Sequence, residues 1–241
     1  YLTQTSANNY FSQGGTSLLV TRVQSGSFEG ASSTSIFNGD DSSAFTLTTL
    51  TEGEIANNSG SEGTNGTLPN GSKDNVRWEI QGSNINTGTF SLLIRRGDDS
   101  SKQKNVLETF QDISLDPKAP NYISKVIGDT SFSVEQDGTD YYVKSDGTYV
   151  NKSKYVRVSA VNTPTVDYFD NDGIAKDSYT GSLPIDGSGS FENATGTLFD
   201  GQEAKFNHDI DSNIQGLGQS DYVQSINLLS NKDEYRYNLI T

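Results

Sequence analysis

Acidic side chains are the residues of this sequence whose types and spacing come closest to a reactive arrangement. Two adjacent pairs, Asp40–Asp41 and Asp98–Asp99, offer the carboxyl groups that glycoside hydrolysis uses. That reaction needs two carboxyl groups facing each other across a cleft that holds the sugar. Neighbouring acids beside a glycine are typical of turns, and each pair directly follows a glycine. We therefore assign neither pair a catalytic role.

Two looser groups of acids contain the oxygen ligands that Ca²⁺ prefers. One group surrounds Gly173 and the other follows His208; together they comprise Asp167, Asp170, Asp172, Asp177, Asp209, Asp211 and Asn213. Neither group matches the ligand spacing of the calcium-binding helix–loop–helix motif, with its central glycine and final glutamate. The sequence therefore predicts no metal site.

His208 is the only histidine, and the chain has no cysteine. Recognised spacings for a nucleophile with its base, or for a zinc site, cannot be assembled from these residues. The Gly-x-Ser-x-Gly turn of serine hydrolases is also missing from the sequence. We interpret His208 as a surface or capping residue. We predict no catalytic, cofactor-binding or metal-binding residues, no cofactor and no enzymatic activity.

Two further patterns have structural interpretations. Arg95 and Arg96 stand at the end of a predicted strand, where we expect a solvated strand end or, as the alternative, ion pairs with acids of a neighbouring subunit.

Asn-x-Ser/Thr sequons occur at several asparagines, as chance produces in a chain so rich in these residue types. They are Asn57, Asn65, Asn70, Asn151 and Asn193.

The composition excludes several classes of function. The net charge is −14, whereas binding to a nucleic-acid backbone needs clustered Lys and Arg. Apolar runs are far shorter than the roughly 20 residues that span a bilayer. We therefore expect neither a nucleic-acid nor a membrane partner. The 24 glycines and the abundant Ser, Thr, Asn and Asp favour short strands joined by polar turns.

The elements that position these residues are organised around residues 88–128. Apolar and polar residues alternate over 90–95 and again over 106–111, which predicts two strands of an antiparallel hairpin. A turn at Asp116–Pro117 follows. Pro120 then occupies the first position of a predicted short helix, which Gly128 ends.

Further strands and helices are predicted on both sides of this segment. Strands are expected at 16–23, 44–50, 75–81, 130–134, 140–144, 147–151, 154–161, 190–199, 203–207 and 235–240, and helices at 2–12 and 220–229. We expect Trp78 in the core, because its neighbours at a spacing of two are aliphatic. Residues 52–74 should form a mobile surface loop, and the strand ending at Val161 should complete a meander.

These elements predict an α+β protein that is predominantly β. A helix and strand at residues 1–24 and another pair at 219–241 would form part of an α/β core, into which an antiparallel β-rich domain at 25–161 is inserted. Residues 162–218 are expected to be a loop-rich excursion. The sequence begins with Tyr1 and contains no methionine, so we expect a processed or partial stretch of a longer polypeptide.

Several stretches resemble, in the same order, the tail sheath proteins of contractile-tailed bacteriophages. The similar stretches are YFSQGG and LLVTRV, then LLIRRGDD, LETFQDISLDPKAPNYISKVIGD and KYVRVSAV, and finally YVQSINLLSNKDEYRYNLIT. The resemblance covers about residues 7–24, 44–56, 88–161 and 220–241. Residues 57–75 and 162–218 resemble nothing in that family.

The resemblance implies a structural virion protein. Its subunits would polymerise as a six-fold helical sheath around the tail tube and contract, which drives the tube through the host cell envelope for genome ejection. The implied partners are other copies of the chain, the tail tube protein, and the baseplate and tail terminator proteins. The implied location is the virion tail, assembled in the cytoplasm of the host bacterium.

Two other classes of function stay open on the sequence. A β-rich adhesin or carbohydrate-binding surface module would have a self-contained fold with an aromatic-lined groove, and an enzyme would have a polar cleft with a perturbed acid. Within the sheath hypothesis, a related contractile injection system is a further alternative to a phage.

Overall fold

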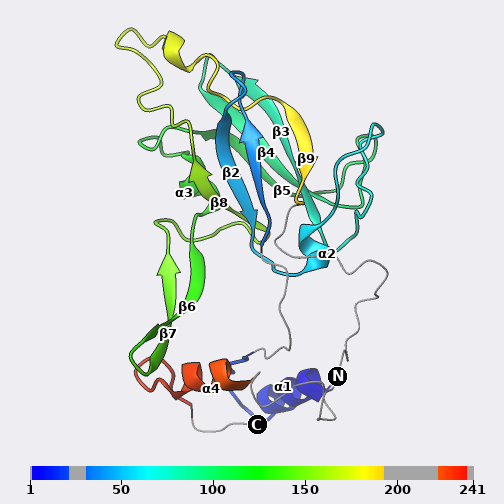
Figure 1. Ribbon diagram of the computed structural model, residues 1–241, viewed down its shortest axis with the longest axis vertical. Coiled ribbons are helices and arrows are strands. Elements are labelled where there is room, and N and C mark those ends of the chain that lie inside the picture. The colour runs from blue at the N-terminus through cyan, green and yellow to red at the C-terminus, as the bar shows by residue number, and fades with distance from the viewer. Residues whose placement is uncertain (1, 22–30, 193–221, 238–241) are drawn as a thin grey trace. The chain divides into compact units, whose positions relative to one another are not determined.

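Antiparallel sheets form most of the regular secondary structure of the described residues, and helices are few, which confirms the prediction of a predominantly β member of the α+β class (Figure 1). The computed structural model describes residues 2–21, 31–192 and 222–237. The chain divides into two compact units. The larger unit comprises Ser27–Ser133 and Lys144–Gly201, and the smaller unit comprises Tyr1–Gly26, Val134–Val143 and Gln202–Thr241.

A four-stranded antiparallel sheet is the main layer of the larger unit. Its strands lie in the order β5-β4-β3-β9, with β3 at Val76–Asn84, β4 at Thr89–Arg96, β5 at Val106–Ser114 and β9 at Gly187–Ser190. The predicted hairpin of residues 90–111 is therefore confirmed as β4 and β5. On β4, the alternating residues Phe90, Leu92 and Ile94 are buried, as the pattern of the sequence indicated.

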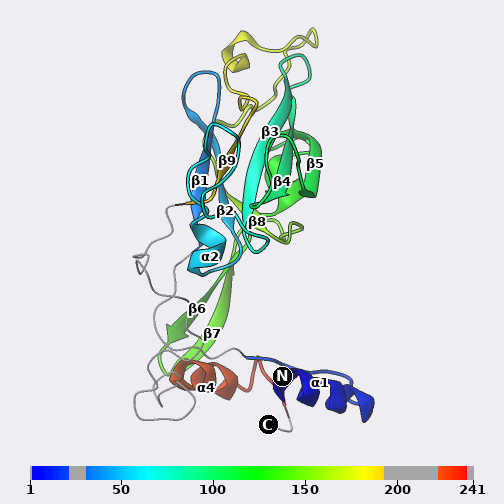
Figure 2. The ribbon, with the colours of Figure 1, turned by 90° about the vertical axis from the view of Figure 1, so that its right-hand side faces the viewer.

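A second, three-stranded sheet faces the first and closes the core between them (Figure 2). It consists of β1 at Ser33–Phe37, β2 at Ser43–Thr49 and β8 at Val156–Val161, with β2 in the centre. The rings of Phe45 on β2 and Phe90 on β4 stack across the interior with centroids 5.6 Å apart. The core is thus a layer of aliphatic and aromatic side chains between two sheets.

A short helix, α3 at Ile123–Ile127, packs beside β5 and β8. Its residues Ile123 and Ile127 are fully buried. The helix was predicted, but Pro120 is not its first residue: Pro120 lies in the preceding turn, and the helix begins only after Tyr122. Gly128 ends the helix with φ at 109°, where a Cβ would lie 2.3 Å from the Cα of Asn151. Only glycine fits this close approach.

Residues 52–74 are not the mobile surface loop that their composition predicted. They contain the short helix α2 at Glu54–Asn57 and bury Asn57, Ser59 and Leu68. The Asn57 side chain bonds to Thr49, Ser32 and the carbonyls of Thr51 and Gly53. Polar side chains therefore hold this segment against the sandwich in place of an apolar stripe.

The chain between α3 and β8 forms a separate two-stranded hairpin, β6 at Ser131–Asp137 and β7 at Asp140–Asp146. The Asp137–Gly138 turn was predicted. The prediction of a strand at 147–151 is wrong, because these residues form no strand. The prediction of a meander is also wrong, because β8 does not pair with β7. It pairs with β2, which lies more than 100 residues earlier in the sequence.

The excursion after β8 returns to the larger sheet. It includes a 3-10 turn, η1, at Asp177–Tyr179, and the strand β9, which pairs with β3 and overlaps the strand expected at 190–199 only at Ser190. Residues 193–199 of that expected strand lie outside the described residues. A Cβ at Gly189 would lie 2.5 Å from the Trp78 ring, so the glycine makes room for the indole. Trp78 packs against the core, as predicted. The strand expected at 203–207 lies outside the described residues.

The smaller unit contains the predicted helices, α1 at Leu2–Ser12 and α4 at Val223–Ser230. The buried strand expected at 16–23 is not found: residues 15–21 are not in a strand, and Leu18–Val20 are exposed. Residues 235–237 likewise form no strand, and 238–240 lie outside the described residues. The apolar residues of α4 are not a buried stripe, because Val223 and Ile226 are exposed. No helix of the described residues is long and apolar enough to cross a membrane.

We predict that Leu92→Ala lowers the free energy of unfolding of the larger unit by about 2–5 kcal/mol, because it opens a cavity between the two sheets. Urea denaturation of the wild-type and variant proteins measures this. Val150→Ala is the matched control, since Val150 is 79% exposed. Equal losses in the two variants would contradict the described core.

Candidate functional site

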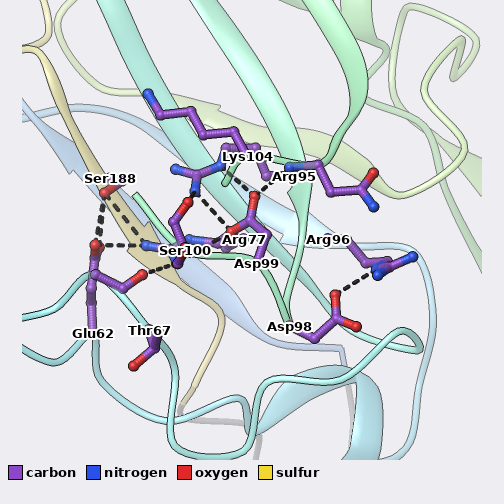
Figure 3. Close-up of polar contacts among 12 residues, drawn as sticks. Glu62, Thr67, Arg77, Arg95, Arg96, Asp98, Asp99, Ser100, Lys104 and Ser188 are labelled. Atoms are coloured by element: carbon purple, nitrogen blue, oxygen red, sulfur yellow. Dashed lines mark hydrogen bonds and ion pairs between the residues drawn. The ribbon is translucent and has the colours of Figure 1, made fainter. Parts of the chain in front are cut away.

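The most elaborate polar arrangement of the described residues is a buried network of charges at one end of the β3–β4 hairpin (Figure 3). Arg77 on β3 and Arg95 on β4 are partners directly across the two strands. Like charges in such positions repel each other. The site therefore depends on the acids that stand between and around the two guanidinium groups.

Asp99 is the central acid. It follows β4 in the turn Gly97–Ser100, which folds back so that the carboxylate meets both arginines. Asp99 accepts two hydrogen bonds from Arg95, at 2.8 Å from Nε and 2.7 Å from Nη2, and its Oδ1 lies 3.5 Å from Arg77 Nη1. The forked contact with Arg95 is the strongest ion-pair geometry available to these groups. The backbone N–H of Asn105 also donates to Asp99.

Two glutamates and a lysine complete the network. Glu79 on β3 accepts from Arg95 Nη1 at 2.9 Å and from Lys104 Nζ at 2.6 Å. Glu62, in the segment after α2, accepts from Arg77 Nη2 at 2.7 Å and from the Ser188 hydroxyl on β9. The network thus contains three cations and three carboxylates, so its net charge is zero.

Burial separates this network from ordinary surface ion pairs. Arg77 is 0% exposed and Arg95 is 1% exposed. The carbonyl of Gly66 accepts from Arg77 Nη1, and the carbonyl of Ser100 accepts from Arg95 Nη2. Arg77 Nε has no hydrogen-bond partner within the described protein. Buried charges are tolerated only when paired, and this network satisfies nearly every donor.

The chemistry of this arrangement is structural. All three carboxylates already accept from cations, and no two of them face each other across an open cleft. Among the described residues, no group of three or more His, Cys, Asp or Glu side chains could hold a metal ion. What the network does is fasten residues 62–66 and 97–105 to the outer face of the sheet.

The structure separates the roles of the acid pair Asp98–Asp99. Asp99 is buried in the network, whereas Asp98 bonds to the partly exposed Arg96. Both expectations for Arg95 are wrong, because acids of its own chain pair with it in the interior. Arg96 is the residue at the surface. The other pair, Asp40–Asp41, lies in the turn between β1 and β2, as predicted.

The acids around Gly173 hold turns together. Asp170 Oδ1 accepts from the backbone N–H groups of Asp172 and Ile174, both at 2.9 Å. Asp167 accepts from Lys118 Nζ at 2.7 Å. Of the sequon asparagines, Asn57 is fully buried and Asn193 lies outside the described residues, as do His208, Asp209, Asp211 and Asn213.

Arg77, Glu79 and Lys104 were missed by the sequence reasoning. Arg77 and Glu79 alternate along β3 with Val76, Trp78 and Ile80. This alternation places the two charged residues on the face of the sheet opposite the core. That face would be solvated if residues 52–74 were mobile. The covering segment, with Glu62 and Gly66, is what turns a surface row of charges into a buried network.

No family model matches this sequence, and no curated protein matches it either. The class of function is therefore argued from the residues of this chain.

We predict that Arg95→Met destabilises the larger unit by about 3–5 kcal/mol, because Asp99 and Glu79 would be left buried without their main partner. Thermal and urea unfolding measure this. The neighbouring variant Arg96→Met removes the same charge from an exposed pair and should change stability by only about 0–1 kcal/mol. If the two variants were equally stable, the network would not hold the fold.

The exposed pair Lys118–Asp167 has a predictable pH response. The hydrogen bond and charge of Lys118 lower the pKa of Asp167 below its ordinary value. Stabilisation by this pair is therefore present above the ordinary pKa of an aspartate and is lost as the pH falls through the lowered value. We predict that Lys118→Met raises the pKa of Asp167 in an NMR titration, and that the small stability difference from wild type disappears in acid. An unchanged Asp167 titration would contradict this.

Proposed function

We propose that this chain is part of a tail sheath subunit of a contractile-tailed bacteriophage, a structural protein without enzymatic activity. The sheath polymerises around the tail tube and contracts to drive the tube through the host envelope. The proposal takes its class from the resemblance of the ordered stretches between YFSQGG and YVQSINLLSNKDEYRYNLIT. The elements of the sequence, read without that resemblance, predicted the predominantly β, antiparallel fold that the structure has.

The observation that carries a role in assembly is the exposure of apolar residues in the smaller unit. Leu18, Leu19 and Val20 are 43%, 55% and 66% exposed, and Val223 and Ile226 on α4 are 49% and 60% exposed. The continuous apolar run Leu18–Val20 and the helical spacing of Val223 and Ile226 are patterns typical of core residues. Apolar stretches of this kind are typical of surfaces that pack against further protein.

The larger unit supports the same proposal through a second observation. Its sandwich core and buried charge network give it an interior of its own. A sheath that contracts needs such rigid bodies, because the energy of contraction comes from new contacts between subunits that move as units. Partners of the proposed subunit are other copies, the tail tube, and the baseplate and terminator proteins of a virion tail.

Electron microscopy of the full-length gene product tests the proposal. We expect tubes or sleeves, and we expect Ile226→Glu to abolish them, because a charge would enter a buried contact between proteins. Val150→Glu is the matched control: Val150 is equally aliphatic and 79% exposed, but belongs to the larger unit. Both variants should unfold like the wild type, since neither side chain is buried.

Two results would contradict the proposal. One is tube formation by Ile226→Glu at the wild-type level. The other is a monomeric full-length product that binds carbohydrate, as an adhesin or carbohydrate-binding module would.

A further inference from the structure

Asp146 and Gly147 lie where β7 ends, and the backbone N–H of Gly147 donates to Oδ1 of Asp146, its own preceding side chain, at 3.1 Å. The carboxyl carbon is one bond from that oxygen, so it lies beside the glycine nitrogen. Attack of this nitrogen on that carbon closes a five-membered succinimide ring. From this geometry we infer that Asp146–Gly147 is a site of spontaneous aspartate isomerisation.

The atoms of the reaction balance without any co-reactant except water. The Gly147 nitrogen forms a bond to Cγ of Asp146 and loses its proton, and the carboxyl group loses its hydroxyl, so that one water leaves. Hydrolysis then adds one water to either carbonyl of the ring. Opening at one carbonyl restores aspartate, and opening at the other gives isoaspartate, in which the main chain runs through the former side chain.

Solvent reaches this position. Asp146 and Gly147 are both exposed and line a groove of about 310 Å³ together with Asp129 and Ser131. Water for the hydrolysis is therefore at hand. Gly147 has φ at 121° and no side chain to hinder the approach of the nitrogen.

The other Asn-Gly and Asp-Gly pairs of the described residues are the internal comparison. In four of them, the glycine nitrogen or the preceding side chain is engaged within a turn. Gly66, Gly71 and Gly173 donate to the carbonyls of Gly63, Leu68 and Asp170, and the Asn38 oxygen accepts from Asp40 and Ser42. A nitrogen or carbonyl held in this way is directed away from ring closure.

Two Asp-Gly pairs remain. Asp186 accepts from the backbone N–H groups of Gly82 and Ser83, both at 3.1 Å, which fixes its carboxylate near the end of β3. Asp137, the last residue of β6, is the competitor, because the hydrogen bonds and ion pairs of the described residues leave its side chain unengaged. Only at Asp146 does the glycine nitrogen meet the side chain that it would attack.

Isomerisation would also change the surrounding structure. A Cβ at Gly147 would lie 2.8 Å from both Asp129 O and Thr130 Cα, so the backbone has little room here. Asp129 Oδ1 accepts from the N–H groups of Thr148 and Tyr149. An extra main-chain carbon at position 146 would displace these two donors and loosen the root of the β6–β7 hairpin.

The test is incubation of the full-length protein in water labelled with oxygen-18, followed by digestion and mass spectrometry. We expect labelled isoaspartate to accumulate about tenfold faster at Asp146 than at Asp137, because at Asp146 the glycine nitrogen is already held beside the carboxyl group that it would attack. The same incubation in urea should make the two rates similar. Hydrogen exchange should show faster exchange of the Thr148 and Tyr149 amides in the aged native protein.

Asp146→Glu is the control variant, since it keeps the charge but disfavours the five-membered ring. We expect it to unfold like the wild type and to keep the Thr148 and Tyr149 amides protected on ageing. Native rates at Asp146 equal to or below those at Asp137 would overturn the inference, as would equal loosening of the aged Asp146→Glu protein.

Discussion

The structure of the larger unit depends on the neutralisation of two buried arginines that face each other across β3 and β4. Because Arg77 and Arg95 are directly opposite each other on neighbouring strands, their charges repel, and each guanidinium group loses its hydration in the interior. Asp99 resolves both problems, because its carboxylate contacts both guanidinium groups. Asp99 comes from the turn after β4, and Glu62 and Gly66, which cover the arginines, come from the segment after α2. The need to neutralise the two arginines therefore fixes the position of two loops that have no apolar core of their own.

This requirement explains where sequence reasoning succeeded and where it failed. The β4–β5 hairpin, α3 and the packing of Trp78 against the core follow from local alternation, turn residues and a glycine at positive φ, which a short window of sequence contains. Residues 52–74 were misjudged because their composition is that of a loop. Their order comes from single polar contacts, such as Glu62 to Arg77 and Asn57 to Thr49, with residues distant in the sequence.

The same difference accounts for the errors in strand pairing. Successive strands commonly pair, so a meander was the natural expectation for residues 130–161. In the structure, β8 does not pair with β7 but with β2, because Val156 and Val158 join Leu47 and Phe45 of the same sheet in the core. The burial of these valines is worth more than a local hairpin, since a two-stranded ribbon buries little apolar surface. Alternation shows that β8 has a buried face, but not which sheet it joins.

The two units illustrate opposite uses of apolar residues. In the larger unit, apolar residues fill the interior and charges are buried only in a balanced network. In the smaller unit, apolar residues remain exposed on α4 and at Leu18–Val20. The larger unit has already buried its apolar residues and paired its buried charges. The exposed apolar residues of the smaller unit would lower the free energy only by leaving water for a contact with further protein. A sheath subunit as proposed above would use both features, a body with its own core and apolar surface for contacts with further copies, and this is the physical reason for proposing assembly rather than ligand binding.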